Sequence, residues 1–399
     1  MYKLNFQHLF LLLSLPFLCS CQPTKQNTEK VVLEEVKKNI ITGAERLDQY
    51  LPLLEGKKVG LLVNHTSLVG NTHLLDTLIA SKIEVAKVFA PEHGFRGKAD
   101  AGEKVNNEID AKTGVPLVSM YGNKKKPTPE QMAGLDIVIF DMQDVGARFF
   151  TYFSAMQYMM EACAENGIDM LILDRPNPNG HYVDGPILDL KNKSYVGLNP
   201  IPIVHGLTAA EYAKMIVGEQ WIDNGEKLKL SILEMENWDH QTPYSLPVKP
   251  SPNLPNDQSI ALYPSVCLFE GTIVSVGRGT YDAFQVIGLP DSTMGNFSFT
   301  PKSIDGMSKY PPYQDKVCYG VDLRKVKVKD QLDLSHIIDF YNKSKDKEKF
   351  FNNYFVKLAG IDQLQKQIEA GLSENQIRAS WQDGLEDYKN KRSKYLLYD

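Results

Sequence analysis

Five short apolar segments in the first half of the chain each run into a cluster of polar residues. The segments span residues 58–63, 84–90, 116–119, 136–140 and 169–173. Short runs rich in Val, Ile and Leu that alternate with helical segments are typical of βα units and a buried parallel sheet. In such sheets a ligand binds beyond the carboxyl ends of the strands. We therefore expect the acids, amides, histidines and arginines that follow these runs to converge on one edge of the sheet.

The length and charge of the chain limit the classes of protein that it can form. A chain of 399 residues favours two domains. We expect an α/β protein with a Rossmann-like parallel-sheet domain over residues 40–190 and a smaller α/β (α+β) domain over residues 191–399. The net charge of −5 and the absence of a long basic block argue against nucleic acid as a partner.

The N-terminus has the pattern of an export signal. Lys3 precedes an apolar run over residues 9–18 that is too short to cross a bilayer. The run ends in Leu18-Cys19-Ser20-Cys21, which resembles a bacterial lipoprotein signal. This resemblance implies cleavage after residue 20, lipidation of Cys21 and a tether over residues 21–39, so that the protein is anchored to a membrane on its periplasmic or cell-surface side. The alternative is an ordinary signal peptide.

Capping and helix-breaking residues predict the remaining elements. Helices are expected over residues 73–81 and 151–166, with Gly167 as the stop of the second. Thr208 and Glu211 form a capping box for a helix that ends near residue 218. A half-buried strand is expected over residues 227–233, and the six prolines within residues 243–264 predict irregular structure. Further helices are expected over residues 334–341, 346–351, 361–370 and 374–395, with a weak point at Gly384 in the last.

Several kinds of site lack their usual sequence signals. The chain has no GxGxxG after the first strand, no GxxxxGK[ST] loop, no HExxH and no GxSxG. Dinucleotide binding, phosphoryl transfer, zinc proteolysis and α/β-hydrolase chemistry are therefore not supported, and we expect no cofactor. Cys163, Cys267 and Cys318 are widely spaced, which favours buried free thiols over a disulfide framework or a zinc site.

Glu92 is the strongest candidate for a catalytic group. It follows an apolar run and is flanked by Pro91 and Gly94. A carboxyl that is partly desolvated beside Phe95 would have a raised pKa, which suits a general acid. The alternative is an ion pair between Glu92 and Arg96 that only shapes the loop.

Other polar residues at the strand ends and in the second domain are candidates for supporting roles. Asp144 could supply a second acid. His65 and His93 are expected to form hydrogen bonds rather than to bind a metal, because two histidines are weak evidence for a metal site. Glu270 and Arg278 stand out in the second domain, and Gly277 and Gly279 would let a ligand approach the guanidinium of Arg278. Arginine suits bidentate carboxylate binding, although a turn with a solvated arginine is the alternative.

Nine motifs in order give the chain a family resemblance. They are FAPEHGFRG (89–97), DAGE (100–103), TGVP (113–116), DxQDVGxRxxTY (141–152), LDRPNPNG (173–180), DGP (184–186), PSPNLP (250–255), YPxxCLFEGT (263–272) and GRGT (277–280). Together they resemble the exo-β-N-acetylmuramidase family of the NamZ type, formerly a domain of unknown function. The resemblance covers residue 40 to the C-terminus. Some relatives have SEGRGT where this chain has SVGRGT (275–280), so no acid is available at that position here.

The resemblance implies a site in the cleft between the two domains. It also implies release of N-acetylmuramic acid from the non-reducing ends of peptidoglycan-derived glycans, with Glu92 as the catalytic residue. The lactyl carboxylate of this sugar would require an arginine, namely Arg96, Arg148 or Arg278. Its N-acetyl group would require amide and aromatic partners such as Asn64, Asn177 and Tyr152. Two alternatives stay open, a lyase that eliminates the same sugar and a non-catalytic lipoprotein that binds cell-wall glycans.

Overall fold

The computed structural model describes residues 39–91, 95, 109–120, 122 and 125–398. The predicted signal peptide and tether, with Cys21, lie outside the described residues. The same holds for Glu92, His93 and Arg96.

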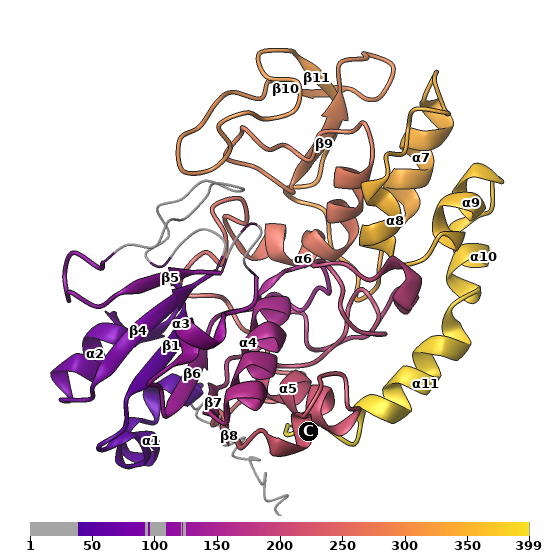
Figure 1. Cartoon of the computed structure of the whole chain (residues 1–399). Coiled ribbons are helices and arrows are strands. Elements are labelled where there is room, and N and C mark those ends of the chain that lie inside the picture. Colours follow the sequence, from indigo (N-terminus) through magenta and orange to yellow (C-terminus); the bar gives the residue numbers. More distant parts are fainter. Residues whose placement is uncertain (1–38, 92–94, 96–108, 121, 123–124, 399) are drawn as a thin grey trace, which may run out of the picture. The chain divides into compact units, whose positions relative to one another are not determined.

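A six-stranded parallel sheet lies at the centre of the first half of the chain (Figure 1). Its strand order is β5-β4-β1-β6-β7-β8, and every neighbouring pair is parallel. The strands are β1 (Val59–Val63), β4 (Val85–Ala90), β5 (Leu117–Ser119), β6 (Ile137–Asp141), β7 (Asp169–Leu173) and β8 (Leu230–Leu233). All five predicted apolar runs are strands of this sheet. The α/β, Rossmann-like class is therefore confirmed.

The sheet continues beyond residue 190. β8 pairs with β7 from Met170↔Leu230 to Leu173↔Leu233. The strand expected over residues 227–233 therefore exists, but it is an edge strand of the first sheet rather than part of a separate second domain. The boundary expected between residues 190 and 191 divides this sheet.

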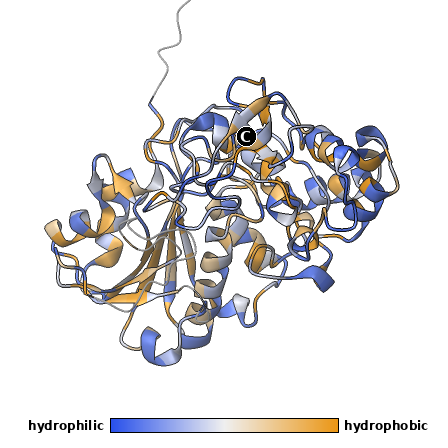
Figure 2. Cartoon of the chain, turned by 90° about the horizontal axis from the view of Figure 1, so that it is seen from above, coloured by the Kyte–Doolittle hydropathy of each residue, from blue (hydrophilic) through white to orange (hydrophobic). Residues whose placement is uncertain are grey.

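Helices cover both faces of the sheet, because successive side chains of each strand point to opposite faces. Leu61 and Val63 of β1 belong to the apolar cluster under α1 (Leu47–Leu54) and α2 (Leu74–Ala80). Leu62 belongs to the cluster under α3, α4 and α5. Figure 2 shows the strands in the colour of hydrophobic residues. The helices of that second face are α3 (Pro129–Met132), α4 (Tyr152–Asn166) and α5 (Ala209–Gly218).

The predicted helix boundaries in this first part are confirmed. Gly167 ends α4 in the left-handed conformation that glycine favours. At the start of α5 the side chain of Thr208 accepts from the backbone N–H of Glu211, and the Glu211 carboxylate accepts from the N–H of Thr208. The short elements of this part are η1 (Gly43–Glu45), β2 (Leu68–Val69), β3 (Thr72–His73), η2 (Leu190–Asn192) and η3 (Gly225–Lys227).

The remainder of the chain, residues 257–398, is called the C-terminal lobe below. Its antiparallel sheet has the order β10-β11-β9 and lies at the top of Figure 1. The strands are β9 (Val286–Leu289), β10 (Phe297–Phe299) and β11 (Cys318–Asp322). The helices are α6 (Asp257–Val266), η4 (Cys267–Gly271), α7 (Ser335–Lys343), α8 (Tyr354–Ala359), α9 (Gln363–Glu369), α10 (Glu374–Ala379) and α11 (Gln382–Arg392).

Three predictions for this lobe are wrong in detail. The proline-rich stretch becomes helical at Asp257, because Asn256 caps α6 by accepting from the N–H of Ser259. Residues 346–351 form turns and no helix. The last predicted helix breaks before Trp381 and not at Gly384. Trp381 is buried and its indole N–H donates to Asp184, a tertiary contact that local sequence does not reveal.

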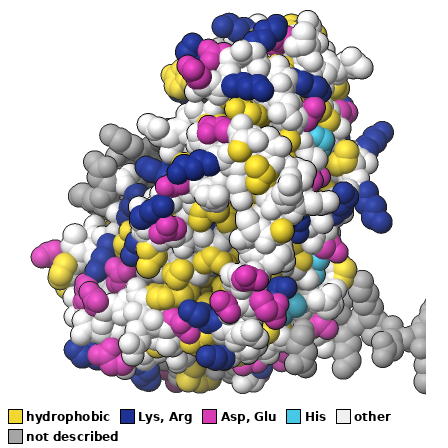
Figure 3. Space-filling view, turned by 90° about the vertical axis from the view of Figure 1, so that its right-hand side faces the viewer, with side chains coloured by type: hydrophobic (Ala, Val, Ile, Leu, Met, Phe, Trp, Pro, Cys, Tyr) yellow, Lys and Arg dark blue, Asp and Glu magenta, His cyan; other side chains and the backbone are white. Residues whose placement is uncertain are grey.

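The predicted state of the cysteines is confirmed, since Cys163, Cys267 and Cys318 are buried free thiols. In the described part of the chain, no helix has the length and apolarity to cross a membrane. Figure 3 views the side on which α9, α10 and α11 lie in Figure 1, and basic and acidic side chains are interspersed over it. This mixture agrees with the modest net charge of −5.

The C-terminus returns to the sheet of the first part. The hydroxyl of Tyr398 donates to Oδ2 of Asp174 over 2.8 Å and accepts from the N–H of Met235 over 3.0 Å. Leu397 N–H donates to the buried Glu211 carboxylate over 3.0 Å. These bonds join the last residues of the chain to the ends of β7 and β8 and thereby fix the C-terminal lobe against the parallel sheet.

Candidate active site

The loops that follow β1 and β6 begin side by side at the carboxyl edge of the sheet, where β4 also ends. Leu62 of β1 pairs with Phe89 of β4, and Val63 pairs with Asp141 of β6. Pro91 is the last described residue after β4, and Glu92 is the next residue in the sequence. The chain therefore leads toward the predicted catalytic loop at the same edge that carries Asn64 and the residues after Asp141.

Asn64 and His65 each have one polar atom without a hydrogen-bond partner among the described residues. Asn64 is buried, and its Oδ1 accepts from the N–H and hydroxyl of Thr66 over 2.9 and 2.6 Å, whereas its Nδ2 has no partner. Nε2 of His65 lies 2.8 Å from the carbonyl of Lys249. Burial lowers the pKa of His65, which favours the neutral ring. Nε2 then carries the proton toward Lys249, and Nδ1 is left as an acceptor.

Asp144 is buried in the loop after β6. Its Oδ1 accepts from the N–H of Gly146 over 2.8 Å, and its Oδ2 has no hydrogen-bond partner among the described residues. Burial raises the pKa of Asp144 to about 7, partly offset by backbone N–H groups. A carboxyl with this pKa could exchange a proton near neutral pH. It does not line the aromatic-walled pocket described below.

Arg148 is buried and its terminal nitrogens are bound to backbone. Nη1 donates to the carbonyls of Pro186 and Ile201 over 3.1 and 2.9 Å, and Nη2 donates to that of Leu358 over 2.8 Å. Burial lowers its pKa to about 9. Because Leu358 belongs to α8, these bonds connect the loop after β6 to the C-terminal lobe. The geometry favours a structural role for Arg148 over contact with a substrate.

Asn177 is likewise held inside its loop. Its Nδ2 donates to the carbonyl of Leu207 over 2.9 Å, and its Oδ1 accepts from the N–H of Asn179 over 2.9 Å. Gly146 packs against it with a φ of +77°, and a Cβ at that glycine would lie 2.2 Å from Oδ1 of Asn177. The turn therefore requires a glycine, and the amide of Asn177 serves the packing of the two loops.

A pocket of about 140 Å³, called the aromatic pocket below, brings together three predicted residues: Tyr152, Glu270 and Arg278. It lies between the end of the loop after β6 and the C-terminal lobe. The prediction missed its other lining residues: Phe149, Phe150, Thr151, Val196, Ser251, Leu254, Tyr263, Phe284 and Tyr354. Phe149 and Phe150 occupy the two unspecified positions between Arg148 and Thr151 in the DxQDVGxRxxTY motif, so the motif itself gives no signal for an aromatic wall.

Edge-to-face ring contacts fix the wall of the aromatic pocket. The ring centroids of Phe149 and Tyr263 are 5.3 Å apart, and those of Tyr263 and Phe284 are 5.0 Å apart. Such pairs add to the stability gained by burying the rings. Tyr152 donates its hydroxyl to the carbonyl of Pro250 over 3.2 Å, which connects this wall to the PSPNLP segment.

Glu270 orients the guanidinium of Arg278 at the aromatic pocket. Nε of Arg278 donates to Oε1 of Glu270 over 2.5 Å, and the guanidinium carbon lies 5.1 Å from the ring centroid of Phe284. Burial alone would lower the pKa of Arg278, but the Glu270 carboxylate raises it above its ordinary value. The side chain is 24% exposed, and its two Nη groups have no hydrogen bond to the described residues. Arg278 therefore presents unused donors at the pocket.

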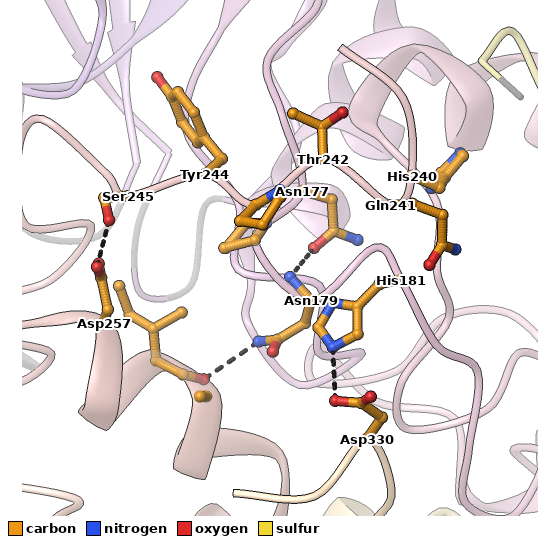
Figure 4. Close-up of a pocket in the computed structure, with 14 residues that line it drawn as sticks. Asn177, Asn179, His181, His240, Gln241, Thr242, Tyr244, Ser245, Asp257 and Asp330 are labelled. Carbon is orange, nitrogen blue, oxygen red and sulfur yellow. Dashed lines mark hydrogen bonds and ion pairs between the residues drawn. The ribbon is translucent and has the colours of Figure 1, made fainter. Parts of the chain in front are cut away.

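A larger polar cavity of about 420 Å³ lies beside the loop after β7 (Figure 4). Asn177 is the one predicted site residue in its lining, and an ion pair of 3.1 Å joins His181 to Asp330. Asn179 donates to the carbonyl of Ile260 over 3.1 Å and is thereby bound to the wall of the cavity. In Figure 4 hydrogen bonds join Asn177 to Asn179 and Ser245 to Asp257. This cavity holds one predicted site residue, whereas the aromatic pocket holds three and is therefore the better candidate.

Among the described residues, no group of three or more His, Cys, Asp or Glu side chains has the arrangement of a metal site. The polar groups at the aromatic pocket are instead one carboxylate, one guanidinium, the hydroxyls of Thr151 and Ser251, and phenolic hydroxyls. A Rossmann-like sheet with a polar pocket beyond the carboxyl ends of its strands is typical of α/β enzymes, and a guanidinium in such a pocket suits an anionic group of a ligand.

Comparison with known proteins identifies the family. Models of the N-terminal and C-terminal domains of the exo-beta-N-acetylmuramidase NamZ match residues 59–258 and 261–398. The chain is 38% identical to the peptidoglycan beta-N-acetylmuramidase NamZ of Bacillus subtilis (strain 168), over 91% of this chain and 92% of that protein. The chain therefore belongs to the NamZ exo-β-N-acetylmuramidase family, and the resemblance inferred from the nine motifs is confirmed.

Solved structures support the same assignment. A DUF1343 family protein from Bacteroides fragilis NCTC 9343 superposes with a TM-score of 0.85 and 48% identity, over 91% of this chain and 99% of that chain. A second DUF1343 family protein of the same strain gives a TM-score of 0.75 and 26% identity, over 90% and 99% of the two chains. The whole described architecture is thus that of the family.

Proposed function

We propose that this protein is an exo-acting glycoside hydrolase that releases N-acetylmuramic acid from the non-reducing ends of peptidoglycan-derived glycans. The observation that carries the proposal is the match to both NamZ domains, together with 38% identity to the Bacillus subtilis enzyme across 91% of the chain. The polar, aromatic-walled pocket supports it, because sugar rings combine an apolar face with hydroxyl groups.

Glu92 is the proposed general acid. Glycoside hydrolysis requires a proton donor to the leaving-group oxygen and a second group that attacks or stabilises the sugar. Glu92 follows β4 at the carboxyl edge of the sheet and stands in the FAPEHGFRG motif. Asp144 stays the predicted second acid, with a pKa of about 7 but a buried position. The N-acetyl oxygen of the substrate could also act as nucleophile, in which case one protein acid and an orienting acid suffice.

Arg278 is the proposed partner of the lactyl carboxylate. Three observations support it: its side chain lines the aromatic pocket, Glu270 fixes its orientation through Nε, and its Nη groups make no hydrogen bond to the described residues. Paired Nη donors suit a carboxylate, which accepts two parallel hydrogen bonds from a guanidinium. Arg148 offers no such donors, because its terminal nitrogens are bound to three carbonyls.

The reaction can be tested on a chromogenic N-acetylmuramide with mass spectrometry of the released sugar. Hydrolysis adds one water to the sugar, whereas elimination by a lyase does not. We expect turnover and a product with the mass of intact N-acetylmuramic acid. A product lacking the elements of water would establish the lyase alternative, and absence of turnover in folded protein would favour a glycan-binding role.

Membrane anchorage through a lipid on Cys21 is part of the proposal. The motive is the Leu18-Cys19-Ser20-Cys21 sequence, and peptidoglycan fragments occur where such an anchor would hold the enzyme. We expect Cys21→Ala to move the protein from the membrane fraction to the soluble fraction. A Cys21→Ala protein that stays with membranes after a high-salt wash would contradict lipidation as the anchor.

A further inference from the structure

Two tyrosines of the C-terminal lobe are the most exposed large hydrophobic residues in the described part of the chain. Tyr281 is 75% exposed and Tyr310 is 83% exposed. Single apolar side chains at a surface are common and need no explanation. Tyr281 and Tyr310 do require an explanation, because the contacts of their loops place both residues near the aromatic pocket.

Tyr281 belongs to the loop that delivers Arg278 to the aromatic pocket. The loop is a tight turn in which the N–H and hydroxyl of Thr280 donate to the carbonyl of Gly277 over 3.0 and 2.7 Å. Arg278 points inward and pairs with Glu270. Tyr281, three residues further along, is exposed to solvent. This short turn therefore carries both Arg278, whose guanidinium lines the pocket, and Tyr281, whose ring is exposed to solvent.

Tyr310 reaches the same turn from a second loop. Lys302 N–H donates to the carbonyl of Gly279 over 2.8 Å. Gly279 has a φ of +82°, and a Cβ there would lie 2.5 Å from Cγ of Pro311. Tyr310 directly precedes Pro311, so the contact holds its backbone next to the turn that carries Tyr281.

The second loop is also bonded to a segment that lines the aromatic pocket. Nδ2 of Asn253 donates to the carbonyl of Met307 over 2.9 Å. Asn253 lies between Ser251 and Leu254, which both line the pocket. The loop that carries Tyr310 is therefore fastened to the pocket at two points, Gly279 and Asn253, and its exposed ring is held near the pocket rather than on a free chain segment.

We infer that Tyr281 and Tyr310 form a stacking surface for the sugar rings on the leaving-group side of the scissile bond. This inference rests on the proposed function. The pocket has a volume of about 140 Å³, which leaves the rest of a glycan chain outside it. A pyranose ring presents axial C–H groups on its faces, and the electron-rich face of a tyrosine ring attracts them. The two tyrosines adjoin the pocket that we propose binds the terminal sugar. We therefore infer that the ligand of these rings is the rest of the same glycan chain.

The test compares two substrates that differ in the presence of further rings. One is a chromogenic N-acetylmuramide, whose leaving group carries no further sugar. The other is a peptide-free glycan strand prepared from peptidoglycan. For Tyr281→Ala and for Tyr310→Ala we expect kcat/KM on the strand to fall about three- to tenfold. The value on the chromogenic muramide should stay within about twofold of wild type, because that substrate does not reach the two rings.

Matched variants separate ring stacking from other effects. Tyr281→Phe and Tyr310→Phe keep the rings and should retain wild-type kcat/KM on the strand. Leu190→Ala removes an exposed apolar side chain from η2, another element, and should also be neutral. Thermal unfolding of each variant checks that the fold is unchanged.

The outcomes distinguish this inference from the proposed function. Wild-type protein that cleaves neither substrate overturns both. Wild-type protein that cleaves both, with alanine variants that keep full kcat/KM on the strand, overturns the stacking surface alone. Equal losses on both substrates would also overturn it, because the tyrosines would then act at the pocket and not on further rings.

Discussion

The loops at the carboxyl edge of the sheet and the loops of the C-terminal lobe use arginine in opposite ways. Arg148, after β6, is buried and its terminal nitrogens donate to three backbone carbonyls. Arg278, in the C-terminal lobe, is 24% exposed, is held through Nε by Glu270 and makes no hydrogen bond through its Nη groups to the described residues. Both stand in family motifs, and the sequence gives no local sign of the difference.

The difference shows that a polar residue at a strand end is not thereby a ligand-binding residue. Buried polar groups are ordinarily hydrogen-bonded, and backbone carbonyls of neighbouring loops accept from both terminal nitrogens of Arg148, whereas its Nε has no partner among the described residues. A guanidinium that is to bind a substrate needs a partner that orients it without occupying all its donors. Glu270 has this role for Arg278. We therefore expect the carboxyl edge to supply the acid and the structural support, and the C-terminal lobe to supply recognition.

The largest expected effect is at the carboxyl edge. Glu92→Gln should lower kcat by ~10²–10⁴-fold, because the amide keeps the shape of the side chain and cannot donate the proton. The assay is turnover of a chromogenic muramide by protein with wild-type thermal unfolding. Glu84→Gln is the matched control, since Glu84 is an exposed residue just before the other end of β4. Near wild-type turnover by the Glu92→Gln protein would show that Glu92 is not the general acid.

Arg148→Ala should act on stability rather than on recognition. It removes three charge-assisted hydrogen bonds between the loop after β6 and the segments that contain Pro186, Ile201 and Leu358, and we expect a loss of about 3 kcal/mol in the free energy of unfolding. Urea unfolding measures it, with Arg278→Ala as the comparison variant, for which we expect less than about 1 kcal/mol. An Arg148→Ala protein with unchanged stability and a raised KM would instead place Arg148 in contact with substrate.

Asp144→Asn should change how stability depends on pH. The pKa of Asp144 is raised from 3.8 to about 7 by burial. Unfolding returns it toward 3.8, so the wild type loses stability as pH rises from about 4 to about 7. The asparagine variant lacks this loss. The free energy of unfolding of the variant, minus that of the wild type, should therefore increase across this range by about 4 kcal/mol, because one pKa unit corresponds to about 1.4 kcal/mol, and then level off.

Urea unfolding at several pH values between 4 and 8 measures this difference. Asp174, whose pKa burial also raises to about 7, is present in both proteins and cancels in the comparison. A difference that does not change with pH would show that Asp144 is already ionised in the folded protein. Loss of turnover in a stable Asp144→Asn protein would support its predicted role as second acid.

Much of the fold was predictable because the strongest local signals agree with the tertiary structure. The five apolar runs are strands because a parallel sheet buries both faces of each strand. Gly167 and the Thr208–Glu211 box set helix ends through backbone bonds that local sequence specifies. The break between α10 and α11 falls at Trp381, which is buried and donates to Asp184, nearly two hundred residues away, a tertiary contact that local sequence does not reveal.

The site was predictable by residue type but not by burial. Tyr152, Glu270 and Arg278 were predicted from their residue types and motifs, and all three line the aromatic pocket. Phe149 and Phe150 were missed because large aromatic residues beside a strand are ordinarily core residues. Asn177 was expected at a ligand, yet its amide joins two loops, a choice that depends on the neighbouring Gly146 and Leu207.

The smallest expected effect is in substrate discrimination by the C-terminal lobe. N-acetylmuramic acid differs from N-acetylglucosamine by its lactyl ether, so recognition of the lactyl carboxylate should favour the muramide. Arg278→Ala should reduce the ratio of kcat/KM for the muramide to that for the glucosaminide by about 10- to 100-fold, the range expected for hydrogen bonds to a charged group. The reduction should come from the muramide, because the glucosaminide has no carboxylate to lose.

Arg278→Lys is the matched variant for this measurement. Lysine keeps the charge but cannot form two parallel hydrogen bonds or the Nε bond to Glu270, so an intermediate ratio is expected. Arg96→Ala is the comparison at the carboxyl edge, since Arg96 is four residues from Glu92 in the sequence. A ratio unchanged in Arg278→Ala but reduced in Arg96→Ala would place recognition and acid catalysis in the same loop. The proposal that the C-terminal lobe recognises the lactyl carboxylate would then be wrong.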